Sequence, residues 1–596
     1  MKPPPEERSV NLPLFSVIAV FIGIMTGLGA VFFRALISLV HNALFLGTFS
    51  TIYDANLYTP ASPWGALVIL VPVIGGLAVV FLVQTFAPEA RGHGVPEVMA
   101  AIFYKEGRIR GIVAFVKSFA SALAIGSGSS VGREGPIIQI GASLASSVGQ
   151  AIRLPAWQRI TLVAAGAGAG IAATFNTPIG GVVFAIELMM PEFSTRTFLP
   201  VALATGTATF VGQLFFGPRP AFDVPAVGSL PQVASGAYVL ALYGLLGVFM
   251  GLAAAAFVRG LHFAEETFDR IRNPYLRHTV GMGIVGVVMY LFLRFSGHYQ
   301  IDGVGYATIQ DVLVGGLASA PFLALLFASK LTATSLSLGS GSSGGIFSPS
   351  LYMGATLGAA FGAAAQYFFP GPQISVPAFA IVGMAAMVGG GTGAAMTAVT
   401  MIFEMTRDYG IVMPMIIAVA VSIGVRRVLS RENIYTIKLL ARRQFIPSAL
   451  HANLFLVRHA EDVMDKDFLT LPQATRFDDF LRLPEARGGM RHIVVTGEDR
   501  IAGVLRVNTA LRRGLEGAYT GVTLGEVASR DFTLARPGDA MFDVIGRMWR
   551  KKATMAVVVG SNRAGAADVL GIISKEHVAD SVAESIKHYA ATSSPL

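Results

Sequence analysis

Residues 125–136 read IGSGSSVGREGP, and residues 338–349 read LGSGSSGGIFSP. The two stretches share seven of twelve residues at an offset of 213. Two weaker matches keep a similar offset: Gly92-x-Gly94 with Gly303-x-Gly305, and FAIEL at 184–188 with IFEM at 402–405. The pattern predicts two halves of common origin, which span about 12–220 and 221–441.

The repeated region is too apolar for a soluble domain. Charged residues make up 14% of the 596-residue chain, against about 25% in soluble domains, and 53% of the chain is hydrophobic. Of the charged residues, 42 fall in 1–441 and 39 in the much shorter 442–596. We therefore expect a membrane domain at 1–441, a linker at 442–461 and a small soluble domain.

Uncharged runs indicate where the chain crosses the bilayer, since about 20 apolar residues span the hydrocarbon. Runs of sufficient length occupy 12–33, 55–88, 160–186, 197–218, 224–258 and 331–403. Runs that we expect to be too short to span lie at 118–132, 135–152, 279–293 and 409–425. The fold class predicted is an all-α polytopic membrane protein with an inverted internal repeat and with helices that stop inside the bilayer.

Several function classes are disfavoured. The chain has no cysteine, so we expect neither disulfides nor thiolate metal sites, and no metal is assigned. The net charge of +9 gathers between apolar runs, which is typical of cytoplasmic loops and makes nucleic acid an unlikely partner. Gly339-x-Gly341-x-x-Gly344 matches a dinucleotide fingerprint, but no strand precedes it, so we do not expect an enzyme.

Three segments share glycines, a proline and then an apolar helical run: GHGVPEVMAAI at 92–102, GREGPIIQIGASL at 132–144 and GGIFSPSLYMGATL at 344–357. Proline suits the first turn of a helix, and a helix N-terminus attracts anions. Three such helix starts predict a site for a small anion. A cation-coupled solute transporter is a more remote alternative, since unwound helices can also hold sodium.

The motifs GHGVP, GREGP and GGIFSP, in this order, resemble the signature loops of the CLC family of chloride channels and proton-coupled chloride exchangers. The resemblance covers about residues 12–441 and includes ENIYTIKLL at 432–440. It implies that chloride is the substrate and that no cofactor is required. It also implies a homodimer in the bacterial inner membrane with both termini cytoplasmic.

The resemblance also implies roles for individual residues. Glu134 would gate the anion path and, in an exchanger, carry the proton. The backbone N–H groups of Ile346 and Phe347 and the hydroxyl of Tyr435 would face the central anion. The other anion-binding candidates are in the same three loops: His93, Gly94, Arg133, Gly135 and Gly345.

Two residues depart from the family pattern. His93 stands where well-known members have serine, so its imidazole either donates to the anion or turns away and leaves binding to the backbone. Leu188 stands where many exchangers have the acid that serves as the internal proton station, and a leucine cannot carry a proton. We therefore expect a passive channel first and a proton-coupled antiporter as the alternative. Glu187 is a candidate relay, or else a partner for a helix end.

The tail repeats short strands and helices once, at 462–515 and 516–596, which resembles a cytoplasmic α/β pair of CBS motifs. Such pairs often bind adenine nucleotides, but Thr509 and His577 replace the aspartates expected to hold ribose. We favour a structural or dimerisation role over nucleotide sensing.

Overall fold

The structure is a computed structural model, and it divides the chain into two compact units, Met1–Gln444 and Phe445–Leu596. It describes residues 9–190, 194–224, 237–370, 374–442, 444, 446, 458–483, 491–497, 500–508, 510, 519, 521–560 and 568–579. Most of the expected linker at 442–461 and Thr509 lie outside these residues. Each unit is considered by itself below.

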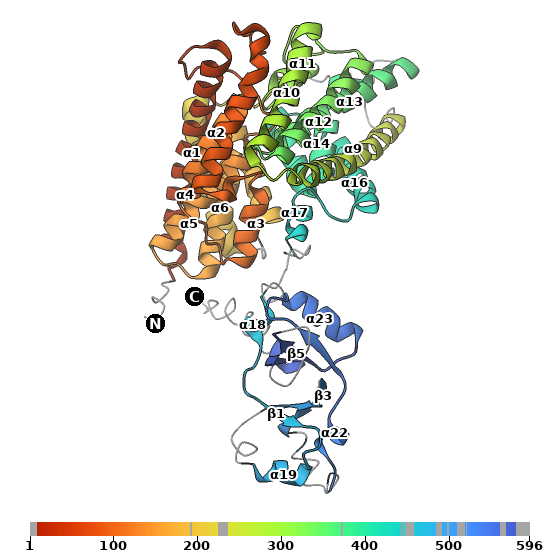
Figure 1. The fold of residues 1–596 in the computed structure, drawn as a ribbon. Helices are drawn as coiled ribbons and strands as arrows, with labels where there is room; N and C mark the ends of the chain where they lie inside the picture. Colours follow the sequence, from red (N-terminus) through yellow and green to blue (C-terminus); the bar gives the residue numbers. More distant parts are fainter. Residues whose placement is uncertain are drawn as a thin grey trace. The chain divides into compact units, whose positions relative to one another are not determined.

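The first unit is all helical (Figure 1). Its α-helices are α1 (Leu12–His41), α2 (Val71–Phe86), α3 (Val95–Tyr104), α4 (Ile112–Gly126), α5 (Glu134–Ala151), α6 (Ala156–Phe175), α7 (Pro178–Phe184), α8 (Thr195–Phe216), α9 (Ala237–Asp269), α10 (Pro274–Ser296), α11 (Tyr306–Leu313), α12 (Ala320–Ser340), α13 (Phe347–Phe368), α14 (Val376–Thr392), α15 (Ala395–Thr406), α16 (Val412–Leu429) and α17 (Thr436–Ala441). Shorter turns are η1 (Asn42–Leu46), η2 (Gly65–Leu70), η3 (Pro88–Ala90) and η4 (Ala185–Met189). Among the described residues, seven helices are long and apolar enough to cross a membrane.

The helix packing repeats with the predicted two-fold relation. Helix α1 packs against α4, α6 and α8, and α9 packs against α12, α14 and α16 in the same way. The pairs α5 with α6 and α13 with α14 are the corresponding broad contacts in the two halves. The repeat that the sequence predicts is therefore present in the packing of the helices.

Two loops, one from each half of the repeat, lie next to each other. Gly132 donates its N–H to the carbonyl of Gly345 at 2.7 Å, and Gly345 donates back to Gly132 at 2.6 Å. These residues are 213 positions apart, the offset of the sequence repeat. A mutual exchange of hydrogen bonds is what a local two-fold relation produces, so the repeat axis passes between this pair.

The prediction that 279–293 and 409–425 are too short was wrong. Helix α10 extends to 23 residues because Arg277 and Arg294 lie in its outer turns. Helix α16 reaches 18 residues because Arg426 is buried within it, where its guanidinium donates to the carbonyls of Gly390, Ser430 and Arg431. A charged residue ends an apolar run in sequence, but it does not end a helix when the charge lies at the end or finds buried acceptors.

The expected run 160–186 is divided in the structure. Helix α6 ends at Phe175, and Asn176 adopts a left-handed conformation with φ of 59°. Pro178 then begins α7. Glycine- and proline-rich segments also divide the run 331–403, where they separate α12 from α13 and α13 from α14.

The described residues of the second unit form two sheets of the same topology. Its strands are β1 (Phe468–Pro472), β2 (His492–Thr496), β3 (Ile501–Arg506), β4 (Phe532–Ala535), β5 (Met555–Val559) and β6 (Val569–Ser574), and its helices are α18 (Ala460–Val463), α19 (Phe477–Arg482), α22 (Leu524–Val527) and α23 (Met541–Arg550). In each sheet the first pair is parallel and the second antiparallel with an irregularity. Residues from both sheets share one core cluster, an arrangement compatible with the expected pair of motifs.

Candidate anion pathway

Three helix starts meet inside the first unit, and glycines make the approach close. A Cβ on Gly135 would lie 2.2 Å from the carbonyl oxygen of His93. A Cβ on Gly345 would lie 2.7 Å from the amide nitrogen of Gly135. Gly94 has a φ of 82°, which residues other than glycine adopt at a cost. The loops before α3, α5 and α13 therefore pack together as the sequence motifs predict.

Glu134 is the first residue of α5, and its side chain is fully buried at this meeting point. The hydroxyl of Tyr306 donates to Oε1 at 2.5 Å. The hydroxyl of Ser348 donates to Oε2 at 2.5 Å, and the Ser348 amide donates to the same oxygen at 3.2 Å. A buried carboxylate is stable only when it is hydrogen-bonded or paired, and these donors meet that need.

The amides of Ile346 and Phe347 lie at the start of α13, next to the amide that binds Glu134. Among the described residues, no protein group accepts a hydrogen bond from either amide. Both residues are buried. Unpaired donors at the positive end of a helix are suited to a negatively charged ligand.

Tyr435 and His93 lie together within the same unit. Their ring centroids are 6.0 Å apart, and both side chains are about 1% exposed. Asn433 fixes the turn that carries Tyr435, because its side-chain oxygen accepts the amides of Tyr435 and Thr436. The family-like segment at 432–440 thus delivers the tyrosine to the loop that begins α3.

Nδ1 of His93 is buried and has no hydrogen-bond partner among the described residues. The preceding residue, Gly92, is flanked by two ammonium groups. Lys117 donates to the Gly92 carbonyl at 2.6 Å, and a Cβ on Gly92 would lie 2.6 Å from Nζ of Lys438. A protonated imidazole would add a third positive charge here, so we expect His93 to be neutral and able to donate one N–H.

The Arg133 side chain lies next to Tyr306 and Glu134. Its guanidinium carbon lies 5.0 Å from the centre of the Tyr306 ring, and its Nε lies 3.9 Å from Oε1 of Glu134. It also lines a pocket that Tyr306 borders. Its charge therefore acts on Glu134.

Glu187 accepts three hydrogen bonds at the start of α15. The amide of Met396 donates at 3.1 Å, and the amide and hydroxyl of Thr397 donate at 2.8 and 2.7 Å. This is the helix-end partnership that the sequence left open. Leu188 follows it in η4 and is partly buried.

Sequence reasoning missed Tyr306 and Ser348, the two hydroxyl donors to Glu134. Ser348 lies inside the motif GGIFSP, directly after the backbone groups that the family resemblance indicates. Tyr306 follows Gly303-x-Gly305, the repeat partner of Gly92-x-Gly94. The internal repeat could have indicated Tyr306, since a loop equivalent to one at the anion site belongs near the same axis.

Comparisons with known proteins agree with this geometry. The sequence profile described as voltage gated chloride channel matches residues 75–427. The H(+)/Cl(-) exchange transporter ClcA of Vibrio parahaemolyticus is 36% identical over 363 residues, which cover 60% of this chain and 75% of that protein. A slow cyanobacterial Cl-/H+ antiporter superposes with a TM-score of 0.63 at 24% identity, over 73% of this chain and 99% of its own.

A eukaryotic CLC transporter has the same fold, with a TM-score of 0.58 at 20% identity over 94% of this chain and 97% of its own. The profile match covers more than half of the chain, and the exchange transporter is matched over three quarters of its length. On the evidence of the three loops, the buried Glu134 and these matches, the chain is a member of the CLC family of anion transport proteins.

Proposed function

We propose that this protein exchanges chloride for protons across a membrane, and that Glu134 both closes the anion path and carries the proton. The observation that carries the proposal is the position of Glu134. Its carboxylate is fully buried, accepts hydrogen bonds from Tyr306 and Ser348, and lies beside the unpaired amides of Ile346 and Phe347. The carboxylate therefore lies at a position where the surrounding donors could also bind a transported anion.

Protonation of Glu134 changes both of its interactions. The neutral acid no longer competes for the positive end of α13, and it loses part of its capacity to accept from Tyr306 and Ser348. The side chain then gives way to chloride and takes its proton with it. Proton binding and anion entry are coupled because they involve the same few donors.

The amides of Ile346 and Phe347 form the central anion site in this proposal, with Tyr435 and the neutral His93 as donors next to it. None of these groups is a cation held in the path. A neutral set of donors binds chloride firmly enough to select it but lets it leave.

The exchanger takes precedence over the channel that Leu188 first favours. The curated relative that matches three quarters of its length is named an H(+)/Cl(-) exchange transporter. Leu188 still removes one route for protons, so a passive channel is the competing reading. By the same family likeness we propose a homodimer in the bacterial inner membrane, with the basic loops and both termini cytoplasmic.

For the C-terminal unit we propose a structural role. His577, which stands where a nucleotide-binding aspartate was expected, has its Nε2 3.2 Å from a carboxylate oxygen of Asp465. Its imidazole is therefore already engaged within the domain.

The test uses the full chain in proteoliposomes. A chloride gradient is imposed, valinomycin and potassium hold the voltage at zero, and the lumenal pH is followed. Exchange predicts proton movement against its gradient in the wild type and none in Glu134→Gln, whose side chain cannot take up a proton. Chloride flux without uphill protons in the wild type would instead establish the channel.

A further inference from the structure

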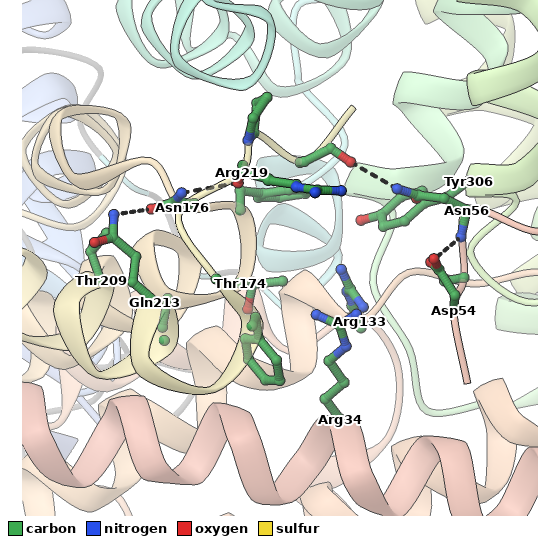
Figure 2. A pocket seen from close by; sticks show the side chains of 18 of the residues that line it. Arg34, Asp54, Asn56, Arg133, Thr174, Asn176, Thr209, Gln213, Arg219 and Tyr306 are labelled. Carbon is green, nitrogen blue, oxygen red and sulfur yellow. Dashed lines mark hydrogen bonds between the residues drawn. The ribbon is translucent and has the colours of Figure 1, made fainter. Parts of the chain in front are cut away.

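Tyr306 borders a pocket of about 280 Å³, and three arginines line it (Figure 2). Arg34 comes from α1, Arg133 precedes α5, and Arg219 follows α8. The pocket runs from an exposed mouth at Arg219 to Arg133, whose side chain is 12% exposed. Its inner wall is formed by groups that contact or adjoin Glu134.

The three guanidinium groups have free donors. Within the described part of the chain, none of them donates a hydrogen bond to a protein acceptor, and Nε of Arg133 is buried without a partner. Arg34 lies 4.3 Å from the centre of the Phe216 ring, and Arg133 lies 5.0 Å from that of Tyr306. An aromatic ring that stacks on a guanidinium group covers the flat face of that group and leaves the N–H groups at its edge free to donate.

The pocket carries a positive charge that its own acids do not cancel by contact. Asp54 and Asp223 also line it, but neither forms an ion pair with an arginine among the described residues. The Asp54 carboxylate accepts from the amide of Asn56 instead, at 3.0 Å. Three arginines against two aspartates leave a net positive lining, and a concave surface concentrates that field.

Hydrogen bonds hold the backbone of the loops at the mouth of the pocket. Asn176 donates to the carbonyl of Arg219 at 3.1 Å, and Gln213 donates to Asn176 at 2.7 Å. Asn56 donates to the carbonyl of Ala221 at 3.1 Å and connects the two loops at the mouth. Figure 2 shows these bonds around the three arginines.

The pocket adjoins the gate directly. Arg133 is the neighbour of Glu134, and Tyr306 lines the pocket while its hydroxyl binds the Glu134 carboxylate. Arg34 lies 22 residues after the start of α1, which is about 33 Å along that helix. The pocket is thus far from the N-terminal end of α1, near the loops that follow α8 and α10.

We propose that Arg34, Arg133 and Arg219 form an outer site for a small monovalent anion, which waits there until Glu134 moves. The site rests on the proposed function, because it gives the exchanged chloride a place outside the gate. The cavity has room for an anion with part of its water shell, since a water takes up about 30 Å³ in the liquid. Because Arg219 is exposed, a hydrated ion held at that end of the pocket can exchange quickly with the solvent.

The first test locates the anion itself and does not depend on proton coupling. Crystals of the full chain are soaked in bromide, and anomalous scattering is measured for the wild type, Arg34→Gln, Arg219→Gln and Arg294→Gln. Arg294 is the matched control, because it is an exposed arginine in the last turn of α10 and does not line the pocket. We expect bromide in the pocket of the wild type and of Arg294→Gln, and its loss from the other two variants.

The second test measures chloride uptake against external chloride in proteoliposomes. Loss of one charged donor should raise the external KM about tenfold in Arg34→Gln and Arg219→Gln, and should not raise it in Arg294→Gln. Bromide at the Ile346 and Phe347 amides but not in the pocket, or an unchanged KM, would overturn the outer site. The proposed exchange of chloride for protons would still hold in either case if the wild type moves protons uphill. If the wild type moves no protons uphill, the proposed exchange is refuted, but the bromide result still decides whether the outer site exists.

Discussion

Glu187 and Glu404 each cap the helix that carries the other. The carboxylate of Glu187, at the end of α7 and η4, accepts the amides of Met396 and Thr397 at the start of α15. The carboxylate of Glu404, within α15, accepts the amides of Ile179 and Gly180 at the start of α7, at 3.1 and 2.6 Å. A carboxylate at a helix N-terminus is stabilising because it satisfies unpaired donors and complements the helix dipole.

This reciprocity predicts that Glu187 is structural. Glu187→Gln and Glu404→Gln should each lower stability by about 1 to 2 kcal/mol, since each keeps one acceptor but loses the charge. Thermal unfolding in detergent measures the loss, and the two variants should behave alike. A Glu187→Gln protein of unchanged stability that has lost only its proton flux would show instead that this acid relays protons.

The hydroxyl groups of Tyr306 and Ser348 donate to Glu134 and should stabilise the position in which it closes the anion path. Tyr306→Phe and Ser348→Ala each remove a donor to a charged acceptor, which is worth about 1.5 to 3 kcal/mol. We expect faster chloride flux at neutral pH and a shift of the pH at half-maximal flux towards higher pH. Tyr243→Phe is a control, because this buried tyrosine stacks on Phe379. Slower flux in both gate variants would contradict the view that these hydroxyls hold the closed position.

Two buried lysines bind corresponding loops in the two halves. Lys117 donates to the carbonyls of Ala90 and Gly92, and Lys330, 213 residues later, donates to those of Ile301 and Gly303. Each lysine holds the loop that precedes a short helix, α3 or α11.

Lys330→Met should leave the carbonyls of Ile301 and Gly303 unpaired, at a cost of about 1 to 3 kcal/mol for each group. Lys117→Met should cost less, because the Ala90 carbonyl still accepts from the Ser343 hydroxyl and the Gly92 carbonyl from the Gly344 amide. Size-exclusion profiles after graded heating measure this, with the exposed Lys105→Met as control. Lys117→Met should also weaken chloride binding in calorimetry, because its loop carries His93. Wild-type heat resistance in both variants would argue against this role.

The C-terminal unit should lose stability in acid. Burial lowers the pKa of His492 below its ordinary value of 6.5, and the charge of His577 acts in the same direction. The unfolded state therefore binds more protons in this range, so stability falls as the pH drops below about 6.5.

Hydrogen exchange of the full chain checks this, with intrinsic rates corrected for pH. Amides of β2 and β6 should be less protected at pH 5.5 than at pH 7.5, and His492→Asn should remove most of the difference. The same pH response in that variant would locate the cause elsewhere.

The sequence predicts the helix starts of the site well, because glycine and proline have strong local preferences. The loops before α3, α5 and α13 meet as expected from their motifs. Helix ends near charged residues were predicted less well. Arg426 donates to the carbonyl of Gly390 as well as to nearby carbonyls, and Lys117 donates to those of Ala90 and Gly92. The partners that are distant in sequence cannot be identified from a local pattern.

The side chains that bind Glu134 could not be predicted from local sequence patterns either. Tyr306 reaches Glu134 from 172 positions away, so only the internal repeat connects the two loops in sequence. Leu188 illustrates the opposite limit. A missing acid is plain in the sequence, but whether protons find another route depends on groups that only the folded chain brings together.

The mutual bonds of Gly132 and Gly345 have a consequence for the origin of the protein. The first repeat supplies Gly132 and the starts of α3 and α5, and the second supplies Gly345 and the start of α13, so a single repeat builds only part of the proposed anion site. A half-length ancestor could have transported anions only by pairing with an oppositely oriented copy of itself in the bilayer. Gene fusion would then have fixed the two orientations in one polypeptide and freed each copy to diverge, with Glu134 retained on one side and Phe347 on the other.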